Sequence, residues 1–297
     1  MALQAAKSTT AAAGLNLASL ADYLQLSKPE VTALILVATG AGFYAGSAGS
    51  LQPALMAHTL VGTLLTAVGT AALNQYLERD VDARMARTRG RPLPAGRMAP
   101  ARALAFGLLT GTAGVAHLAW FANGLAALLA FLTMASYLLL YTPQKRRSPS
   151  CTTLGAVPGA VPPLIGWAAA AGRLDPGAWI LYAVLFLWQF PHFMAIAWIY
   201  REDYQRAGIR MLPVVEPDGR GTARQVLWTA GALIPVSLLP SLIGMAGPLY
   251  AVAALLLGVA FLYCAWRMAN RRTVAEARRL LHASVIYLPL LYAFLLV

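Results

Sequence analysis

Charged residues are scarce in this chain of 297 residues, and acidic residues are the scarcest. Only 11% of the residues are charged, against about a quarter in soluble domains, whereas 59% are hydrophobic. A soluble enzyme with a single water-facing shell is therefore excluded. The two cysteines, Cys151 and Cys264, lie far apart without CxxC spacing, so neither a disulfide framework nor a zinc site is indicated.

Basic residues outnumber acidic ones by 23 to 11, which gives a formal net charge of +12. In a soluble chain this excess would suggest a nucleic-acid partner. Here the basic residues form short clusters between long apolar runs, so we expect no nucleic acid. Residues 1–21 are rich in Ala, Ser and Thr and contain neither arginine nor a compact apolar core. They predict a flexible tail rather than a signal or transit peptide.

Long apolar runs are the dominant feature of the rest of the chain. A bilayer core about 30 Å thick requires roughly 20 apolar residues per helix. The fold class that we predict is all-α: a polytopic membrane protein whose single domain, residues 22–297, has nine transmembrane helices. The expected spans are 31–49, 52–72, 101–120, 123–141, 153–171, 177–198, 225–244, 248–267 and 280–297.

The distribution of basic residues predicts the orientation of these spans. Lysine and arginine in short loops favour the cytoplasmic side, and all but Arg173 of the 23 basic residues fall on one side of the nine spans. We therefore expect a cytoplasmic N-terminus and a C-terminus on the opposite side. Ten of the eleven acidic residues also lie on the basic side. Since acids contribute little to orientation, their position needs another explanation.

One group of acids follows the second span. If that helix continues, Asn74, Glu78 and Asp82 recur at every fourth position and share one face. Hard oxygen ligands in this arrangement suit Mg²⁺, which proteins commonly share between one or two carboxylates and a substrate phosphate.

Asp80 projects from nearly the opposite side of the same helix, so we expect it to pair with Arg84 or Arg87. The alternative interpretation of the whole segment is a solvated helix end whose acids balance the arginines that follow it. The polar Asn at the membrane side and the basic cluster beyond it favour the metal site.

A second group follows the sixth span. His192 and Asp203 are eleven residues apart, so on an unbroken helix they would share a face at a separation of about 16 Å. An ionisable residue inside a membrane helix is a functional hypothesis by default. A lone histidine can equally form a hydrogen bond between helices, and the spacing alone leaves both roles open.

Two acidic helix ends with basic residues between them can act together. Carboxylates would hold Mg²⁺, the metal and basic side chains would hold a diphosphate, and an apolar membrane pocket would hold a hydrocarbon. Such a site favours departure of diphosphate from an allylic chain, because the negative charge is neutralised where it develops. The sequence contains no Walker-type loop, GxGxxG motif or serine-histidine-acid arrangement that would compete with this interpretation.

The same residues resemble a known family. The first acidic segment, with Arg87-Thr88-x₂-Arg91-Pro92-Leu93, is similar to the first aspartate-rich motif of the intramembrane aromatic prenyltransferases, the UbiA superfamily. The matching branch is the one that farnesylates haem. The supporting stretches are Tyr141-Thr142-Pro-x-Lys145-Arg146, Trp188-Gln-x-Pro191-His192-Phe and Tyr200-Arg-Glu-Asp203-Tyr204-x₃-Gly208-Ile-x-Met211-Leu-Pro213. Glu78 departs from the usual aspartate, and the second motif has Glu202 and Asp203 in place of a repeated DxxxD.

The resemblance implies nine helices around a central cavity and an activity. The farnesyl group of farnesyl diphosphate would be transferred to a vinyl group of haem b, giving haem O and diphosphate, with Mg²⁺ as cofactor and haem b as substrate. Membrane lipid would surround an enzyme of the bacterial plasma membrane, and haem A synthase or a terminal oxidase assembly pathway would receive the product. The implied catalytic and metal-binding residues are Asn74, Glu78, Asp82 and Asp203. The implied substrate-binding residues are Lys28, Arg87, Arg91, Lys145 and Arg146 for the diphosphate, and His192 and Tyr200 for haem.

Three alternatives stay open at this stage. A relative acting on a quinone or chlorophyll precursor would use the same diphosphate site, although the Pro191-His192-Phe and Met211-Leu-Pro213 segments disfavour it. A cation-coupled transporter would place charges near the middle of the bilayer, whereas the acids here cluster at one interface. A membrane assembly factor that only holds haem for a partner is the third.

Overall fold

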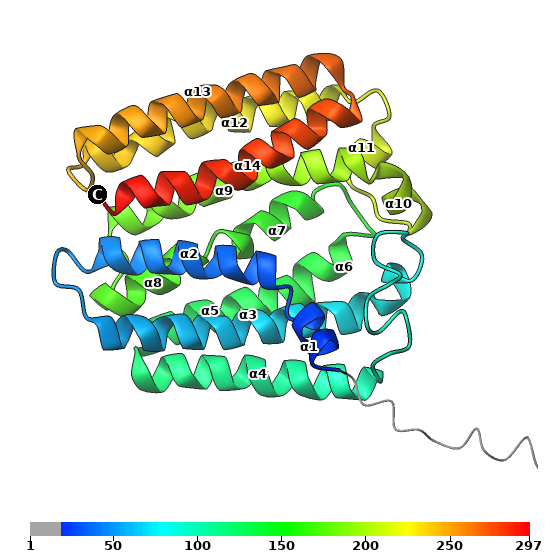
Figure 1. Cartoon of the computed structure of the whole chain (residues 1–297), viewed down its shortest axis with the longest axis horizontal. Coiled ribbons are helices and arrows are strands. Elements are labelled where there is room, and N and C mark those ends of the chain that lie inside the picture. Colours follow the sequence, from blue (N-terminus) through cyan, green and yellow to red (C-terminus); the bar gives the residue numbers. More distant parts are fainter. Residues whose placement is uncertain (1–18) are drawn as a thin grey trace, which may run out of the picture.

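A computed structural model describes residues 19–297, and within that range all regular secondary structure is helical (Figure 1). The elements are α1 (Leu20–Leu26), α2 (Pro29–Gly46), α3 (Pro53–Asp82), α4 (Pro100–Phe121), α5 (Gly124–Ser136), the π-helical η1 (Tyr137–Tyr141), α6 (Thr142–Gln144), α7 (Cys151–Gly159), α8 (Pro162–Ala171), α9 (Pro176–Ile199), α10 (Arg201–Arg206), α11 (Leu212–Val215), α12 (Arg220–Leu242), α13 (Pro248–Arg271) and α14 (Val274–Leu295).

The long helices lie where the apolar runs predict them. Within residues 19–297, seven helical segments are long and apolar enough to cross a membrane. Two further helices, α2 and α14, occupy the first and ninth expected ranges, but each begins with charged residues, Glu30 in α2 and Glu276 in α14. The membrane class is therefore confirmed, whereas the count of nine spans stays a prediction.

The expected N-terminal tail falls outside the described residues as far as residue 18. The last two residues of that range, Leu20 and Ala21, belong to α1. Ser19 caps this helix with its side chain, and Asp22 in turn accepts a hydrogen bond from the Ser19 backbone. This reciprocal capping box fixes where the helix begins.

The outer surface carries many large apolar side chains, whose exposure to water would be unfavourable. Large side chains such as Trp120, Trp228 and Leu109 are 85%, 73% and 70% exposed. Contiguous apolar surface of this kind marks a membrane-facing exterior.

Several of the long helices, α2, α3, α4, α9 and α13 among them, begin with proline at the first turn, where its missing N–H costs nothing.

Small residues bring helix backbones together inside this apolar shell. A side chain on Gly69 of α3 would overlap the backbone of Gly111 in α4, and one on Gly114 would overlap Thr66. A side chain on Gly166 of α8 would likewise collide with the backbone of α2. Close approach through small residues is the usual basis of helix association in membranes, and it makes α3 and α4 a tightly packed pair.

The chain places its charged loops at one end of the helices. The short elements α1, α10 and α11 and the loop that follows α3 lie together there, and the C-terminus lies at the other end (Figure 1). Arg173, the exception in the distribution of basic residues, lies in the connection between α8 and α9 and pairs with Asp175. Most of the residues that the sequence predicts to bind diphosphate and metal lie at this polar end.

Candidate active site

The end of α3 carries the first group of predicted ligands. The helix continues without a break to Asp82, so the prediction that Asn74, Glu78 and Asp82 lie on one helix is confirmed. Asn74 and Asp82 are only 1% and 2% exposed. Asn74 Nδ2 donates to Glu78 Oε2 at 3.0 Å and to Thr142 Oγ1 at 3.2 Å. The three oxygen-bearing side chains thus form a buried polar row.

Each member of this row is bound by a cation that comes from another segment. The contacts are Lys28 Nζ to Asn74 Oδ1 at 2.9 Å, Lys145 Nζ to Glu78 Oε1 at 2.8 Å and Arg91 Nη1 to Asp82 Oδ2 at 2.6 Å. These are charge-assisted hydrogen bonds in a partly dehydrated setting, where such bonds are strong. Six of the expected diphosphate and metal residues therefore belong to the α3 row or contact it directly.

The cations are close enough to repel one another. Burial, together with the charges of Arg91 and Lys145, lowers the pKa of Lys28 to about 7, against the opposing effect of Glu78 and Asp82. Burial also opposes the charge on Lys145, but Glu78 holds the pKa of Lys145 well above its usual value. Three cations around two carboxylates leave positive charge that an anionic ligand would neutralise.

The second group of predicted ligands lies on α10 and contacts the loop that follows α3. The Arg87 backbone N–H donates to Asp203 Oδ2 at 3.2 Å, and Arg206 donates to the other carboxylate oxygen. Desolvation would raise the pKa of Asp203, but these hydrogen bonds hold it below its usual value. The guanidinium of Arg87 stacks on Tyr200 at 4.9 Å and bonds the Tyr204 hydroxyl at 3.3 Å.

Two expectations about these segments were wrong. The helix is not unbroken between His192 and Asp203: α9 ends at Ile199, and Tyr200 has a non-helical backbone (φ −109°, ψ 23°) before α10 begins. The separation and shared face expected from a continuous helix therefore do not apply. Asp80 is exposed, and its ion pair is with Arg79 at 3.9 Å rather than with Arg84 or Arg87.

His192 lies in a different environment from the acids. Its ring stacks on Trp188 with centroids 4.8 Å apart, and Nδ1 lies 2.8 Å from Ser284 Oγ of α14. Ser284 donates its own hydroxyl hydrogen to the Leu281 carbonyl at 2.6 Å, so it can only accept from His192. The proton of the neutral ring must then be on Nδ1, and Nε2 carries a free lone pair.

A cavity of about 340 Å³ opens beside the α3 row, between α3 and the η1–α6 segment. Glu78, Lys145 and Arg146 form its polar part, and the apolar part is lined by Leu77, Val81, Leu138, Leu139 and Ile209. The adjoining π-helical turn is a feature that is frequent at functional sites. The cavity combines a charged end with apolar walls, which suits a molecule with an anionic head and a hydrocarbon chain.

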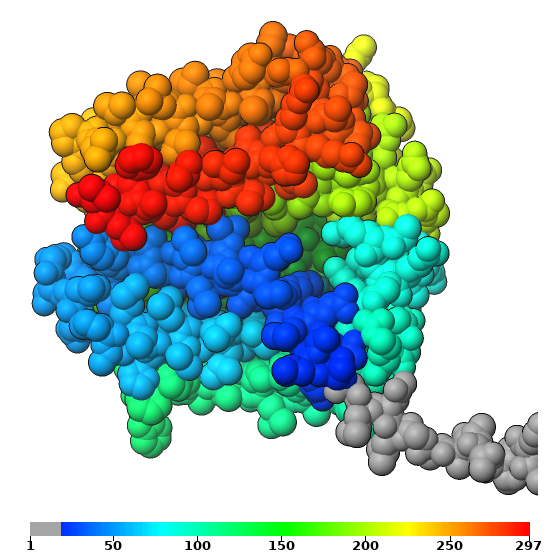
Figure 2. Space-filling view, in the orientation of Figure 1, coloured from blue at the N-terminus to red at the C-terminus, as the bar shows by residue number. Residues whose placement is uncertain are grey.

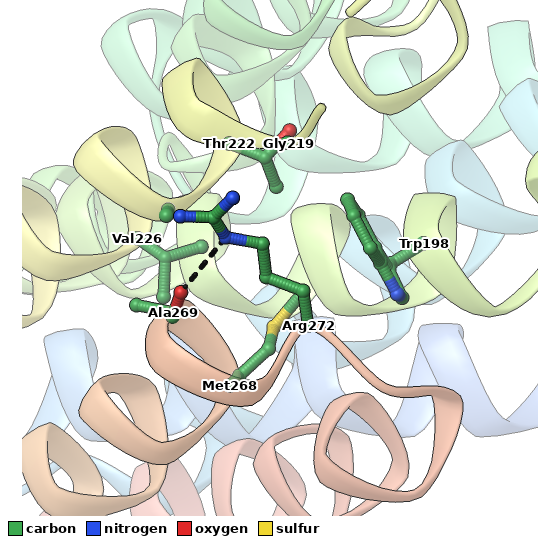
Figure 3. A pocket seen from close by; sticks show the side chains of 8 residues that line it. Trp198, Gly219, Thr222, Val226, Met268, Ala269 and Arg272 are labelled. Carbon is green, nitrogen blue, oxygen red and sulfur yellow. Dashed lines mark hydrogen bonds between the residues drawn. The ribbon is translucent and has the colours of Figure 1, made fainter. Parts of the chain in front are cut away.

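The surface is also hollowed near the charged end. Figure 2 shows a recess between the α1–α2 segment and the loop that follows α3, with segments from the middle of the chain at its base. The two bounding segments are those that carry Lys28 and Arg91. A second pocket, between α12, α13 and the end of α9 (Figure 3), has a volume of only about 10 Å³. It has room for about one water molecule and is no substrate site.

Several contact residues were not assigned in advance. Thr142 and Tyr204 stand inside the motifs that carried the resemblance, so their position was a usable signal. Trp188 also stands inside one of these motifs, whereas Ser284 was harder to find. Ser284 is 92 residues from His192 in sequence and belongs to no motif, so only the packing of α14 on α9 reveals the contact.

The donor set is compatible with Mg²⁺ when phosphate oxygens complete it. No group of three or more His, Cys, Asp or Glu side chains in residues 19–297 is arranged to hold a metal ion by itself. Asn74, Glu78 and Asp82 supply one amide and two carboxylate groups, which is the usual protein share when Mg²⁺ is bound together with substrate phosphates. The carboxylate of Asp203, on α10, accepts a hydrogen bond from the Arg87 backbone instead.

The fold and site together define a membrane-embedded enzyme class that handles a diphosphate beside an apolar pocket. The chain belongs to the UbiA prenyltransferase family, whose model matches residues 34–290. It is 54% identical over 284 residues to the protoheme IX farnesyltransferase of Solibacter usitatus, covering 93% of this chain and 97% of that one. It is 45% identical to the protein of the same name from Koribacter versatilis, with 93% of each chain covered.

Solved structures show the same fold at low sequence identity. A digeranylgeranylglyceryl phosphate synthase superposes with a TM-score of 0.75 at 17% identity, over 93% of this chain and 98% of the other. A UbiA homologue from Archaeoglobus fulgidus, bound to GPP and Mg²⁺, gives a TM-score of 0.68 at 16% identity, over 93% of this chain and all of the other. The expectation of a UbiA-like helical fold is confirmed.

Proposed function

We propose that this enzyme transfers the farnesyl group of farnesyl diphosphate to a vinyl group of haem b, giving haem O and diphosphate. The observation that carries the proposal is the cation-bound row of Asn74, Glu78 and Asp82 beside a cavity with apolar walls. The choice of haem b as acceptor and of farnesyl as the prenyl chain follows from the names of the relatives. In the reaction the C–O bond to diphosphate breaks, a C–C bond to the vinyl group forms, and water supplies the new hydroxyl group and loses a proton.

The basic residues would bind the leaving group. Lys28, Lys145 and Arg91 already converge on the α3 row, and Arg146 lines the same cavity. We assign Arg87 to the diphosphate as well, because it is held by Tyr200 and Tyr204 at the adjoining loop. Charges fixed before the reaction stabilise the developing diphosphate without reorganisation.

Mg²⁺ would be held by Asn74, Glu78 and Asp82 together with phosphate oxygens, and it would supply further neutralisation of the leaving group. We place Asp203 at the edge of this site, as a ligand of a second ion or of the same cluster. Its contact with the Arg87 backbone also positions the loop that carries Arg87 and Arg91.

His192 is the proposed group for haem, as an axial ligand or a positioning residue, with Tyr200 nearby in sequence. The support is the free lone pair on Nε2, which Ser284 imposes by accepting from Nδ1. A hydrogen bond to the non-ligating nitrogen is the usual way in which a protein orients a ligating histidine. His192→Ala should weaken haem binding, and an unchanged haem absorption spectrum and affinity would reject the role.

The orientation of the enzyme in the membrane and the destination of its product are part of the same proposal. The basic end of the helices would face the cytoplasm of a bacterium, with the N-terminus inside and the C-terminus on the other side of the plasma membrane. Haem O is hydrophobic and would pass within the membrane to haem A synthase or to a terminal oxidase assembly pathway.

One assay tests the activity. Purified protein in detergent is given Mg²⁺, farnesyl diphosphate and haem b, and mass spectrometry detects farnesylated haem. A parallel reaction replaces haem with a quinone precursor. We expect product only from haem; prenylation of the quinone precursor alone would refute the proposed acceptor while leaving the diphosphate site intact.

A further inference from the structure

Two histidines meet at the end of α3 that lies farthest from Asp82. His58 lies in the second turn of α3, and His117 lies in the last turns of α4. His58 Nδ1 is 3.3 Å from His117 Nε2. The 24 residues between His58 and Asp82 correspond to about 36 Å of helix, so this pair is independent of the proposed active site.

The packing of α3 on α4 holds the two rings in register. Gly69 faces Gly111, and Gly62 faces Gly114 and Leu118, which describes an antiparallel pair with backbones in close approach. One further turn along the same contact brings His58 opposite His117. Because the glycines fix the separation of the backbones, the two imidazoles are positioned before any ligand binds.

Phe121 covers one side of the histidine pair. Its ring stacks on His58 at 4.5 Å with an interplanar angle of 6°, and its centroid is 4.6 Å from that of His117. Both histidines are half-buried, while Phe121 and the adjacent Trp120 are exposed. Tryptophan at such a position is typical of the membrane interface, where aqueous ions can reach the rings.

We propose that His58 and His117 form a binding site for a divalent transition-metal cation such as Zn²⁺. Zn²⁺ binds imidazole nitrogen at about 2.0–2.1 Å in tetrahedral geometry, which places two ligating nitrogens about 3.3 Å apart. The observed separation matches this value. Each neutral ring keeps its single proton on its other nitrogen, so binding needs no co-reactant, and water completes the coordination. Imidazole ligands suit Zn²⁺, Cu²⁺ and Ni²⁺ rather than Mg²⁺.

A metal bound here would join the beginning of α3 to the end of α4. The ion binds the folded state and therefore stabilises it by mass action. Since α3 also carries the Asn74 row, the cation would brace the helix that presents the proposed active site, from the opposite side of the membrane.

The test uses the full-length protein in detergent, stripped with a chelator. Cu²⁺ serves as the spectroscopic probe, and its electron paramagnetic resonance spectrum should show coupling to two imidazole nitrogens. Zn²⁺ titrated by calorimetry should bind at one site and raise the Tm by roughly 2 °C or more at saturation. His58→Ala or His117→Ala should each weaken Zn²⁺ binding by at least about tenfold.

The matched control is His282→Ala, which removes an exposed histidine of α14 and should leave the affinity unchanged. The spectrum of the unmodified protein decides the question even if a variant fails to fold. Coupling to one imidazole or none, or equal Zn²⁺ affinity in the unmodified protein and the His58→Ala variant, would overturn the proposal and leave the pair as a hydrogen bond between helices.

Discussion

The acidic groups on α3 and α10 differ in where their partners come from. On α3, Asn74 and Glu78 are bound by Lys28 and Lys145, which are 46 and 67 residues away in sequence. On α10, Asp203 is bound by Arg206 on the next turn, together with a backbone N–H. The contacts on α3 form only when four segments of the chain meet. On α10, one of the two contacts of Asp203 joins residues of the same short helix.

This difference indicates different tasks. Long-range charge pairs that are nearly buried are costly unless every group is satisfied, so the α3 row with its surplus of cations is best explained by binding of an anion. The Asp203 contact mainly ties α10 to the loop after α3. Substitutions on the two helices should therefore have unequal effects.

Asp82→Asn should have the largest effect. Asp82 is 2% exposed and holds Arg91 at 2.6 Å, so the variant loses a metal ligand and the partner of a phosphate-binding arginine together. Haem O formation should fall by about 10²–10³-fold, in line with the removal of one preorganised electrostatic group. The measurement is turnover by mass spectrometry, with the Tm in detergent to verify folding.

Asp80→Asn is the matched control for that experiment. Asp80 is on the same helix, but its side chain is 81% exposed and pairs with Arg79 at 3.9 Å. Its removal should leave turnover unchanged within about twofold, as for other surface ion pairs. Equal losses in the Asp80 and Asp82 variants would show that net charge, and not the metal site, governs activity.

The next effect is a dependence of substrate affinity on pH. The pKa of Lys28 is lowered to about 7 in the free protein, and a bound diphosphate would raise it, so binding takes up a proton above pH 7. The Kd of farnesyl diphosphate should therefore rise by up to about tenfold per pH unit above 7. Lys28→Arg keeps the charge at all these pH values and should remove the part of the dependence that comes from Lys28.

The arginine variant also corrects for ionisation of the diphosphate itself, which is the same in both titrations. Parallel slopes for the two proteins would show that Lys28 is already charged before the substrate binds. In that case the protonation of Lys28 would not couple substrate binding at the α3 site to pH.

Asp203→Asn should cost less than Asp82→Asn. The amide can still accept from the Arg87 backbone, although Arg206 loses its charged partner. We expect a loss of about tenfold in turnover, consistent with a displaced loop rather than a lost electrostatic group. A loss as large as that of Asp82→Asn would contradict the comparison and identify Asp203 as a direct metal ligand.

The sequence predicted more of the α3 site than of the α10 site for a physical reason. Helical periodicity places residues 74, 78 and 82 on one face as long as the helix continues, and it does. At Tyr200 the backbone leaves the helical region, and hydropathy carries no signal of that break. The positions of the long helices followed from apolar runs, because the bilayer imposes their length.

Contacts between distant segments could not be predicted in the same way. The sequence shows that Lys28 and Lys145 are basic and predicts on which side of the membrane they lie. Their particular partners depend on how α2, α3 and α6 pack. The Ser284 contact depends on the packing of α14 on α9, which no local pattern encodes. The glycines that set the α3–α4 distance were visible in the sequence, but their register with His58 was not.

Arg206→Gln should have the smallest effect of the series. Its side chain is 58% exposed, and its ion pair with Asp203 joins residues three apart on one short helix. Exposed pairs of this kind contribute about 0–1 kcal/mol, so turnover should change by no more than about fivefold. Arg91→Gln is the matched variant, since Arg91 also pairs with an aspartate but is only 22% exposed. It should lose far more activity, and equal losses in the two arginine variants would mean that the local α10 pair matters as much as the long-range α3 network.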